Sequence, residues 1–394
     1  MDSVKKITPR DWMKTPQSLK IMTALGEGQA MFVGGCVRNT LLDMDVTDID
    51  IATKHHPQKV IEILEAIGVK VIPTGIDHGT VTAIIDKQPF EITTLRKDVA
   101  TDGRRAVIAF ADTWQEDAQR RDFTMNTLLA DPSGHIYDPT GQGMQDLSAR
   151  KVIFVGQAEQ RIKEDILRIL RFFRFHAIYG QGAPNNDALK ACAKYADQIP
   201  TLSKERITQE FLKIISVDNP VDVLRIMFDC GVLKDFICEG ASLETLSHLC
   251  TFQNRYNLAF VASRMLALAG FNMDKVKAME DFLLLPKVFK KDMQAINAVL
   301  NLPDLSSDHA VKVAIYKHGR VATAQSLMIE LATDRVMNGY APSAINIIQN
   351  WDIPNFPLTG QDLMQQGFPQ GPKLGEELSR REDAWIDGGF TDRE

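Results

Sequence analysis

Two aspartates separated by a single residue, Asp48 and Asp50, stand in the stretch TDIDIAT at 47–53. The alternation of this stretch predicts a β-strand, on which side chains two positions apart point to the same face. Two carboxylates that close repel each other unless a cation lies between them, and Mg²⁺ is commonly bound by one or two carboxylates together with substrate phosphates. The pair is therefore a candidate Mg²⁺ site, although a strand face exposed to water or an aspartate-capped turn gives the same short pattern.

A turn of two glycines precedes these aspartates. In the stretch VGGCVR, Gly34 and Gly35 end a predicted strand at 30–35 and open a predicted helix at 36–42, with Arg38 in its first turn. Glycine lets the backbone approach a phosphate closely, the start of a helix attracts anions, and arginine pairs with phosphate oxygens. Together with the two aspartates, the turn indicates a nucleoside triphosphate site, in which two metals about 4 Å apart would stabilise the attacking and leaving oxygens of a phosphoryl displacement.

A third chemical pattern is the basic segment EDILRILRFFRF at 164–175. Drawn as one helix at about 100° per residue, it places Ile166, Ile169, Leu170 and Phe173 on one side. The other side carries Asp165, three arginines and two phenylalanines, namely Arg168, Arg171, Arg174, Phe172 and Phe175. A surface helix with a basic outer face would account for the arginines, but the phenylalanines indicate that this face is covered too. Buried arginines need partners, and the base and phosphates of a nucleotide would supply them.

The composition is that of a globular protein and excludes several classes. A chain of 394 residues predicts two to four domains. No apolar run is long enough to span a membrane, and the first residues lack the apolar stretch of a signal peptide. The five cysteines form no C-x-x-C pair, so neither a disulfide framework nor a zinc site is expected, and a reducing cytoplasm is. The net charge of −6 argues mildly against a nucleic-acid binder, but a basic inner surface within an acidic whole stays open.

The chain divides into two kinds of pattern. Up to about residue 155, short strands alternate with short helices, and a hairpin is expected where 79–85 is joined to 89–95 by the residues DKQ. The polar stretch 96–107 that follows is expected to be a mobile loop. From about residue 156 to roughly 350, helical periods dominate. The sequence therefore predicts a small head of strands and helices followed by a long all-helical remainder.

These motifs, in this order, resemble the class II group of polymerase-β-type nucleotidyltransferases, which contains the CCA-adding tRNA nucleotidyltransferases and the bacterial poly(A) polymerases. GGCVR followed by DID is similar to the first motif of the group, and EITTLRKDVATDGRR to the strand and mobile loop of the CCA-adding type. Four further stretches are similar to the remaining motifs, namely RRDFTMNTL at 120–128, YDPTGQGMQDL at 137–147 with FVG at 154–156, EDILRILRFFRF at 164–175 and ERITQEFLKII at 205–215. The resemblance is strong over 30–215 and mostly architectural beyond.

Two positions depart from the pattern of the family. Asn39 stands where the family usually has aspartate, and Asp43 where it often has glycine. Neither changes the spacing between the arginine and the carboxylates, so only local differences are expected.

The resemblance implies an α+β fold, with a small mixed-sheet nucleotidyltransferase head of five strands followed by an all-helical neck, body and tail. The expected parts are a catalytic head at 1–155, a neck with a base-selecting helix at 156–216, a body at 217–330 and a tail at 331–394. The implied activity is template-independent addition of C, C and A to the 3′ end of tRNA from CTP and ATP. The tRNA 3′-hydroxyl would attack the α-phosphorus and pyrophosphate would leave, with Mg²⁺ as cofactor. Asp48 and Asp50 would be the catalytic metal ligands.

The resemblance also assigns nucleotide binding to eight residues, namely Gly34, Gly35, Arg38, Arg121, Asp165, Arg168, Arg171 and Arg174. Asp165 would accept and Arg168 would donate a hydrogen bond at the edge of the base. Cytosine and adenine both match an acceptor beside a donor, whereas guanine and uracil present the reverse pattern and would leave these groups mismatched. This pair would select CTP and ATP without a nucleic-acid template, and the other two arginines of the helix would support it or bind phosphate.

The sequence leaves open the roles of three neighbouring residues, Asp122, Asn126 and Glu91. Asp122 and Asn126 are expected to fix a turn and the rotamer of Arg121, or else to form an ordinary ion pair at a helix start. Glu91 lies on the strand that should neighbour the two aspartates, as a third carboxylate near the metals or as an ordinary strand glutamate.

The loop TDGRR at 101–105, with Asp102, Gly103 and Arg104, would switch the pocket from C to A, or be a plain surface loop. Its presence argues against an enzyme that adds CC alone, and the stretch 73–85 lacks the basic run usual in poly(A) polymerases. The CCA-adding type is therefore favoured. Poly(A) polymerase, a partial A- or CC-adding enzyme and a non-catalytic RNA-binding module are the alternatives.

Overall fold

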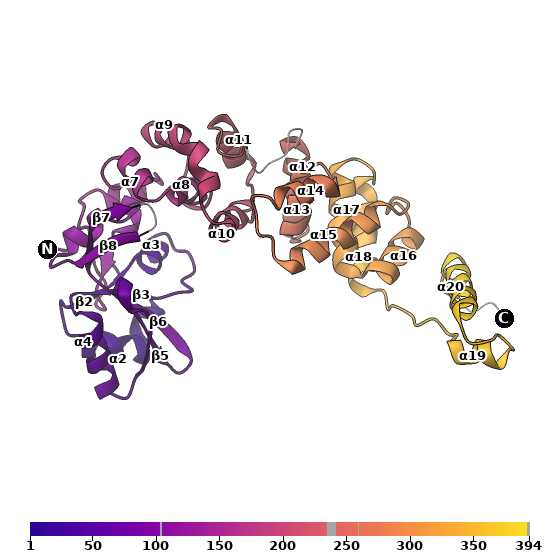
Figure 1. Cartoon of the computed structure of the whole chain (residues 1–394), viewed down its shortest axis with the longest axis horizontal. Coiled ribbons are helices and arrows are strands. Elements are labelled where there is room, and N and C mark those ends of the chain that lie inside the picture. The colour runs from indigo at the N-terminus through magenta and orange to yellow at the C-terminus, as the bar shows by residue number, and fades with distance from the viewer. Residues whose placement is uncertain (103–104, 235–241, 259, 392–394) are drawn as a thin grey trace. The chain divides into compact units, whose positions relative to one another are not determined.

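Figure 1 shows the computed structural model of the chain, which describes residues 1–102, 105–234, 242–258 and 260–391. For residues 98–102 and 105–108 it describes the backbone alone. The chain forms two compact units, Met1–Ile214 with Ile226–Leu233, and Ile215–Arg225 with Lys234–Glu394. The predicted α+β fold, a mixed sheet followed by a helical remainder, is confirmed. The division into head, neck, body and tail stays a prediction.

A mixed sheet forms the framework of the first unit. Its strand order is β1-β10-β9-β2-β3-β6-β5-β4. The strands are β1 Lys5–Lys6, β10 His135–Tyr137, β9 Leu129–Ala130, β2 Ala30–Val33, β3 Asp50–Thr53, β6 Gln88–Thr94, β5 Thr80–Ile85 and β4 Lys70–Gly75. The expected number of five strands is wrong for the described residues, because the short strands β9, β10 and β1 extend the sheet beyond β2.

The hairpin predicted over 79–95 is confirmed as β5 and β6, paired antiparallel from Thr80↔Thr93 to Ile85↔Gln88. Asp86 and Lys87 connect the strands with φ values of 51° and 68°. Two positive φ values are the mark of the tight turn whose twist matches that of the flanking strands. This turn sets the register of β6, the strand that carries Glu91.

The polar stretch expected to be a mobile loop contains two strands, β7 Arg96–Asp102 and β8 Arg105–Phe110. They pair antiparallel as a separate two-stranded sheet, with Arg96 opposite Phe110. The expectation of a loop throughout is therefore wrong, because cross-strand backbone pairing compensates for the polar composition. Gly103 and Arg104, the middle of the predicted switch, lie outside the described residues.

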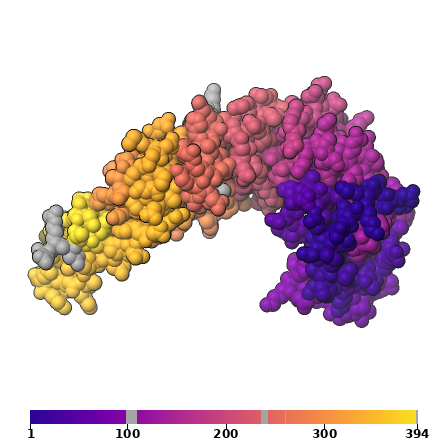
Figure 2. Space-filling view, turned by 180° about the vertical axis from the view of Figure 1, so that it is seen from behind, coloured from indigo at the N-terminus to yellow at the C-terminus, as the bar shows by residue number. Residues whose placement is uncertain are grey.

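Helices cover the sheet and continue the first unit beyond it. Those of the sheet region are α1 Asp11–Lys14, α2 Pro16–Leu25, α3 Gly35–Leu41, α4 Pro57–Ala66, η1 Ile76–His78, α5 Trp114–Gln119, η2 Thr124–Asn126 and α6 Gly143–Ser148. Helices α2 and α4 pack against each other and against the sheet (Figure 1). The helices that follow are α7 Ala158–Glu164, α8 Leu167–Tyr179, α9 Asn186–Tyr195, η3 Ala196–Thr201 and α10 Lys204–Ile215. Helix α11 Val221–Asp229 contributes residues to both units. In Figure 2 the N-terminal residues, in indigo, lie on the surface of the first unit.

The second unit is helical in all its described elements. They are α12 Leu243–Arg255, α13 Val261–Leu268, α14 Met273–Met279, α15 Lys287–Leu300, α16 Asp308–His318, α17 Arg320–Ala332, η4 Asn338–Tyr340, α18 Ala341–Asn350, α19 Gly360–Gln365 and α20 Pro372–Asp387. Helix α17 is buried continuously from Ala322 to Ala332 and packs against α12, α13, α15, α16 and α18. It is therefore the core element of this unit. Among the described residues, no helix combines the length and the apolar character that crossing a membrane requires.

A carboxyl group, that of Glu330, is enclosed within this core. Its side chain is fully buried, Oε2 accepts a hydrogen bond of 2.8 Å from the backbone N–H of Leu305, and Oε1 lies 3.6 Å from Nη2 of Arg335. Burial raises the pKa of Glu330 from 4.5 to about 7, with a smaller contribution from the carboxylate of Asp304, against the opposing effects of Leu305 and Arg335. The folded protein therefore holds a proton at Glu330 that the unfolded chain releases between these two pH values.

This proton predicts a pH-dependent stability. Because the pKa is raised on folding, the stabilising effect is complete below about pH 4.5 and is lost as pH rises through about 7. We expect the free energy of unfolding to fall from pH 5 to pH 8 by about 2 kcal/mol more in the wild-type protein than in Glu330→Gln, as measured by urea denaturation. The exposed Glu376→Gln should behave as wild type, and an equal fall in wild type and Glu330→Gln would contradict the prediction.

Candidate functional site

The predicted glycine turn joins β2 to α3. Gly34 has φ +72° and ψ −125°, a conformation open to glycine and strained for other residues, and α3 begins at Gly35. A Cβ atom added at Gly34 would lie 3.7 Å from Oδ2 of Asp50 and 3.9 Å from Nη1 of Arg121. The structure therefore brings three predicted site residues together, with the turn lying against both a carboxylate and a guanidinium.

Gly34→Ala is expected to disturb the site more than the fold. The strained backbone would cost about 1–3 kcal/mol of stability, and a shift of the turn that relieves this strain would move it relative to Asp50 and Arg121 and lower nucleotide incorporation by roughly 100-fold. Gly182→Ala is the matched control, since Gly182 has φ +69° and no atom within 4 Å of an added Cβ. Nucleotide incorporation and urea denaturation of both variants would check this, and equal loss of activity in the two would count against it.

The two aspartates lie at the start of β3. The strand begins at Asp50, and Asp48 precedes it as an exposed residue, so the prediction that both lie on the strand is wrong. The physical reason is that β2 leaves the sheet at the glycine turn and offers no ladder partner to residues before Asp50. The thiol of Cys36 on α3 contacts the backbone carbonyl of Asp50 at 3.7 Å, which ties the helix to this strand.

Glu91 lies beside the aspartates, as expected from its strand. Strands β3 and β6 run parallel, with Asp50 directly opposite Glu91. Burial first, and then the carboxylates of Glu91 and Asp48, raise the pKa of Asp50 to about 6 against the opposing effects of Arg121 and Arg38. A carboxylate whose ionised form is disfavoured by its neighbours is suited to bind a cation.

The donor set fits a hard divalent cation. Its atoms are carboxylate oxygens, the ligands that Mg²⁺ prefers. Across the described ranges, no group of three or more His, Cys, Asp or Glu side chains is arranged to hold a metal ion by itself. Mg²⁺ usually keeps several waters and is completed by substrate phosphates, so two protein carboxylates next to a turn expected to receive phosphate would suffice.

Arg121 is held by a residue that the sequence reasoning missed. Its Nε and Nη2 donate to Oδ2 of Asp117 at 3.0 and 2.8 Å, while Nη1 lies 3.5 Å from the backbone oxygen of Asn126. Burial alone would raise the pKa of Asp117, but the guanidiniums of Arg121 and Arg120 hold it below its ordinary value. Asp117 therefore fixes the rotamer of Arg121, a role that was expected of Asp122.

Arg38 lies beneath the glycine turn and is only 7% exposed. A Cβ added at Gly35 would lie 3.7 Å from its Nη2 atom. The guanidinium donates to the side-chain oxygens of Asn39, Asn126 and Tyr179, the last two at 2.6 Å. Burial lowers the pKa of Arg38. The residue is thus placed next to the expected phosphate position, in a shell of protein partners.

The segment 164–175, predicted as a single base-selecting helix, belongs to two helices. Helix α7 ends at Glu164, Asp165 is extended at φ −155°, and α8 begins at Leu167. Asp165 breaks the helix because its Oδ1 accepts the N–H of Leu167 at 3.1 Å, the local hydrogen bond by which aspartate starts a new helix. The assumption that Asp165 and Arg168 share one continuous helical face is therefore wrong.

Both residues of the proposed base-reading pair have partners in the protein. Oδ2 of Asp165 accepts from Nη2 of Arg206 at 2.7 Å. Arg168 donates to Glu164 at 2.6 Å and to the backbone oxygens of Arg161 and Arg120 at 2.9 and 3.0 Å. These contacts hold the two side chains in place near the junction of α7 and α8.

The covered face predicted for α8 is confirmed, since Phe172 and Phe175 are 0% and 4% exposed. Two of its arginines, Arg171 and Arg174, pair with protein carboxylates, and their expected role at the nucleotide stays a prediction. Arg171 donates to Oδ2 of the buried Asp122 at 2.8 Å, which holds the pKa of Asp122 at about 2 although burial opposes this. Nε of Arg174 lies 2.6 Å from Oε2 of Glu210 on α10.

The site residues that the sequence reasoning missed differ in whether the sequence contained a signal for them. Asp117 stands four positions before Arg121, and this spacing on a helix brings opposite charges together, so the sequence contained a signal. Tyr179, Arg206 and Glu210 reach the site from later parts of the chain. Arg206 and Glu210 lie in the stretch 205–215 that resembles a family motif, but no local pattern predicted their pairing with Asp165 and Arg174.

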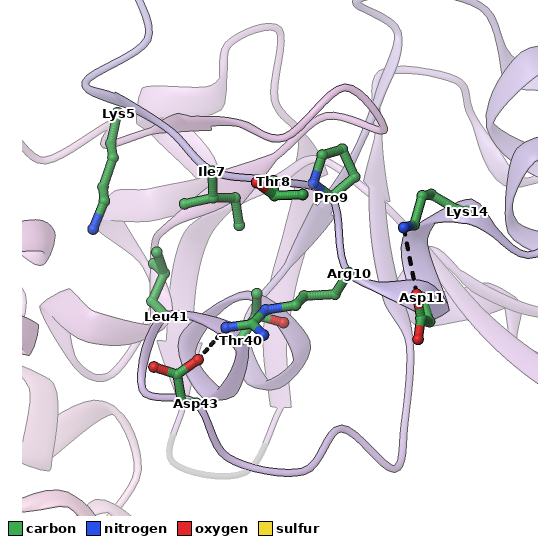
Figure 3. A pocket seen from close by; sticks show the side chains of 10 residues that line it. All are labelled: Lys5, Ile7, Thr8, Pro9, Arg10, Asp11, Lys14, Thr40, Leu41 and Asp43. Carbon is green, nitrogen blue, oxygen red and sulfur yellow. Dashed lines mark hydrogen bonds and ion pairs between the residues drawn. The ribbon is translucent and has the colours of Figure 1, made fainter.

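A cavity of about 590 Å³ lies elsewhere in the first unit (Figure 3). The N-terminal segment and the C-terminal end of α3 line it, through Lys5, Ile7, Thr8, Pro9, Arg10, Asp11, Lys14, Thr40, Leu41 and Asp43. Arg10 pairs with Asp43, and Nζ of Lys14 lies 3.4 Å from Asp11. Its charges are mostly paired and none of the predicted site residues lines it, so the cavity is separate from the candidate site.

Comparison with known proteins identifies the family. The model of the poly A polymerase head domain matches residues 30–153, and that of a probable RNA and SrmB-binding site of polymerase A matches 184–242. The chain is 31% identical over 388 residues to the mitochondrial CCA tRNA nucleotidyltransferase 1 of Mus musculus, covering 95% of this chain and 86% of that protein. It is 31% identical over 370 residues to the CCA-adding enzyme of Latilactobacillus sakei, covering 89% and 88%.

A solved structure agrees with these relatives. The crystal structure of the Bacillus stearothermophilus CCA-adding enzyme in complex with CTP superposes with a TM-score of 0.76 at 26% identity, over 95% of this chain and 94% of that one. The likeness extends over both units, and the matched ranges include the glycine turn, the two aspartates and Glu91. The chain belongs to the family of CCA-adding tRNA nucleotidyltransferases.

Proposed function

We propose that this chain adds C, C and A in turn to the 3′ end of tRNA, using CTP and ATP and releasing pyrophosphate. Family membership supports the overall reaction. The observation on this chain that supports the reaction is the position of Asp50. It lies between Glu91 on the parallel neighbouring strand and the glycine turn at Gly34. This arrangement combines carboxylates for a divalent cation with a backbone that a phosphate can approach.

Asp48 and Asp50 are the residues we assign to Mg²⁺, with Glu91 next to them as a source of negative charge. When bound, the cation would stabilise the charge that develops on the attacking and leaving oxygens during phosphoryl transfer. The protein contributes the position of the carboxylates, since β3 is held by β2, by β6 and by the thiol of Cys36. Because burial and neighbouring carboxylates raise the pKa of Asp50 to about 6, its ionised form is disfavoured and gains from a cation.

The phosphate groups of the nucleotide are assigned to the turn at Gly34 and Gly35, with Arg121 and Arg38 on either side. Arg121 presents Nη1 toward the turn because Asp117 fixes its other nitrogens. Arg38 contributes positive charge from beneath the turn. No side chain of the chain is assigned a covalent intermediate, because the attacking group is the 3′-hydroxyl of tRNA.

Asp165 and Arg168 are assigned to the edge of the base. Each retains hydrogen-bonding capacity, because a carboxylate accepts up to about four hydrogen bonds and a guanidinium donates five. Asp165 uses its oxygens for Leu167 and Arg206, and Arg168 uses three donors for Glu164 and two backbone oxygens. Arg171 and Arg174 hold α8 in place through their pairs with Asp122 and Glu210.

Poly(A) addition is the second candidate, because the matched head model is that of a poly A polymerase. The two activities separate in a simple assay. Purified protein is incubated with tRNA that lacks its terminal CCA and with CTP, ATP, GTP or UTP singly. CCA addition predicts two added residues from CTP alone and none from ATP alone, whereas long products from ATP alone would identify a poly(A) polymerase.

The location of the protein also stays a prediction. We propose the cytoplasm, on the ground of the cysteine pattern. In the part of the chain that the structure describes, the cysteines Cys36, Cys192, Cys230 and Cys250 are all free thiols. Free thiols are typical of a reducing compartment.

A further inference from the structure

The guanidinium of Arg38 has an unusual set of partners for a buried cation. Its hydrogen-bond acceptors are three neutral oxygens, namely Oδ1 of Asn39 at 2.9 and 3.2 Å, Oδ1 of Asn126 at 2.6 Å and Oη of Tyr179 at 2.6 Å. These contacts involve four of the five N–H donors that a guanidinium offers. A carboxylate partner would neutralise the charge, whereas neutral oxygens orient the guanidinium and leave its charge available to an anion.

Charged side chains lie beyond the three neutral partners of Arg38. Asn126, which accepts from Arg38, donates through Nδ2 to Asp122 at 2.9 Å, and Asp122 is in turn paired with Arg171. Arg174 adds a positive charge nearby. Asp122 therefore acts on Arg38 through space but gives its hydrogen bonds to Asn126 and Arg171, so its negative charge is shared with another guanidinium.

Helix α8 supplies the remaining contacts through its last turn. The centre of the Arg38 guanidinium lies 4.1 Å from the ring centroid of Tyr179 and 5.0 Å from that of Phe175. Tyr179 is 8% exposed, and its ring lies 5.4 Å from that of Phe175. Tyr179 thus restrains Arg38 in two ways, through its hydroxyl and through its ring.

We propose that Tyr179 is a positioning residue for nucleotide binding, which holds the Arg38 guanidinium beneath the Gly34–Gly35 turn and so fixes the end of the site that receives the triphosphate. The inference rests on the proposed function, because that function supplies the anion. The role of Tyr179 adds to the proposed function a link between the two ends of the nucleotide. Helix α8 starts beside Asp165, assigned to the base, and ends at Tyr179, which orients the cation assigned to the phosphates.

Tyr179→Phe is the test, because it removes the hydroxyl and keeps the ring. We expect the KM for CTP and for ATP to rise about tenfold, the lower end of what a hydrogen bond to a charged group contributes, with kcat within about twofold because the contact is made in both ground and transition states. The matched control is Tyr195→Phe, which removes the hydroxyl that Tyr195 donates to Glu159 at 2.7 Å outside the site. This control should leave both constants unchanged.

Two ligands separate positioning from a general loosening of the fold. Pyrophosphate carries the charge that Arg38 attracts, and cytidine carries the base and sugar alone. Calorimetric titration of the folded full chain, without tRNA, should show pyrophosphate binding weakened about tenfold in Tyr179→Phe and cytidine binding unchanged. At pH 8, Tyr179→His restores a ring with an acceptor nitrogen and should recover part of the pyrophosphate affinity.

The outcomes are distinct. Unchanged KM and unchanged pyrophosphate affinity in Tyr179→Phe would overturn the assignment, and so would an equal loss of pyrophosphate and cytidine binding, which would mark a structural role. Failure of the wild-type chain to incorporate CTP would refute the proposed function instead. The binding of pyrophosphate to the wild type and to Tyr179→Phe would still decide the role of Tyr179.

Discussion

Asp50→Asn is expected to abolish incorporation of both CTP and ATP, by at least about 1,000-fold, the scale on which loss of several kcal/mol of transition-state stabilisation acts. The substitution keeps the shape of the side chain and removes the charge that the cation requires. Asp48→Ala should have the same effect, since both carboxylates are assigned to the metal. The measurement is the rate of nucleotide addition to tRNA lacking CCA, at saturating Mg²⁺.

The stability of Asp50→Asn should not fall with its activity. Because the pKa of Asp50 is raised to about 6, its ionised form destabilises the folded protein above that pH, and this effect is absent below the ordinary value of 3.8. Removing the charge should therefore leave the urea midpoint at pH 8 unchanged or higher, while tRNA binding persists. The exposed Asp77→Asn serves as the control for activity. Substantial Mg²⁺-dependent turnover in Asp50→Asn would show that the metal is held elsewhere.

Asp165→Ala is expected to weaken the preference for C and A over U and G without abolishing turnover. The carbonyl of U or G would no longer face a carboxylate, and one hydrogen bond to a charged group is worth roughly 1.5–3 kcal/mol, or about 10- to 150-fold in selectivity. Competition among the four nucleotides, on protein shown to be folded, measures the change. The metal and phosphate sites remain intact in this variant.

Arg206→Ala is the matched control for this prediction. It removes the ion pair that Asp165 makes with Arg206 in the structure but leaves the carboxylate itself. Base preference should therefore be retained in Arg206→Ala and relaxed in Asp165→Ala. If Asp165→Ala lowers the rate for all four nucleotides by one factor, α7 and α8 are scaffold and the base is read elsewhere.

Local patterns predicted the parts of the site that local forces build. The glycine turn, the hairpin of β5 and β6 and the position of Glu91 beside Asp50 follow from turn residues, strand alternation and the short connections between elements. These features depend on neighbours within a few residues or on strand pairing that the hydrophobic pattern specifies.

What the sequence could not predict depends on partners distant in the chain. The pattern of EDILRILRFFRF reads as one helix, yet Asp165 binds the N–H of Leu167 and Arg206, which lies 41 residues later. The arginines of α8 were expected to pair with a nucleotide, and the sequence did not reveal that Arg171 and Arg174 also pair with Asp122 and Glu210. Only the contacts of α8 with α10 and with the stretch 120–128 reveal these carboxylates.

The most direct test of the account examines the tRNA product itself. A tRNA transcript ending at the nucleotide before CCA is incubated with the wild-type protein, Mg²⁺ and all four nucleotides at equal concentration, and the mass of the 3′ fragment is measured. We predict a single product longer by C, C and A, and no product with Asp50→Asn. A ladder of adenylates, a product that stops after CC, or incorporation of U or G would contradict the assignment of this chain as a CCA-adding enzyme.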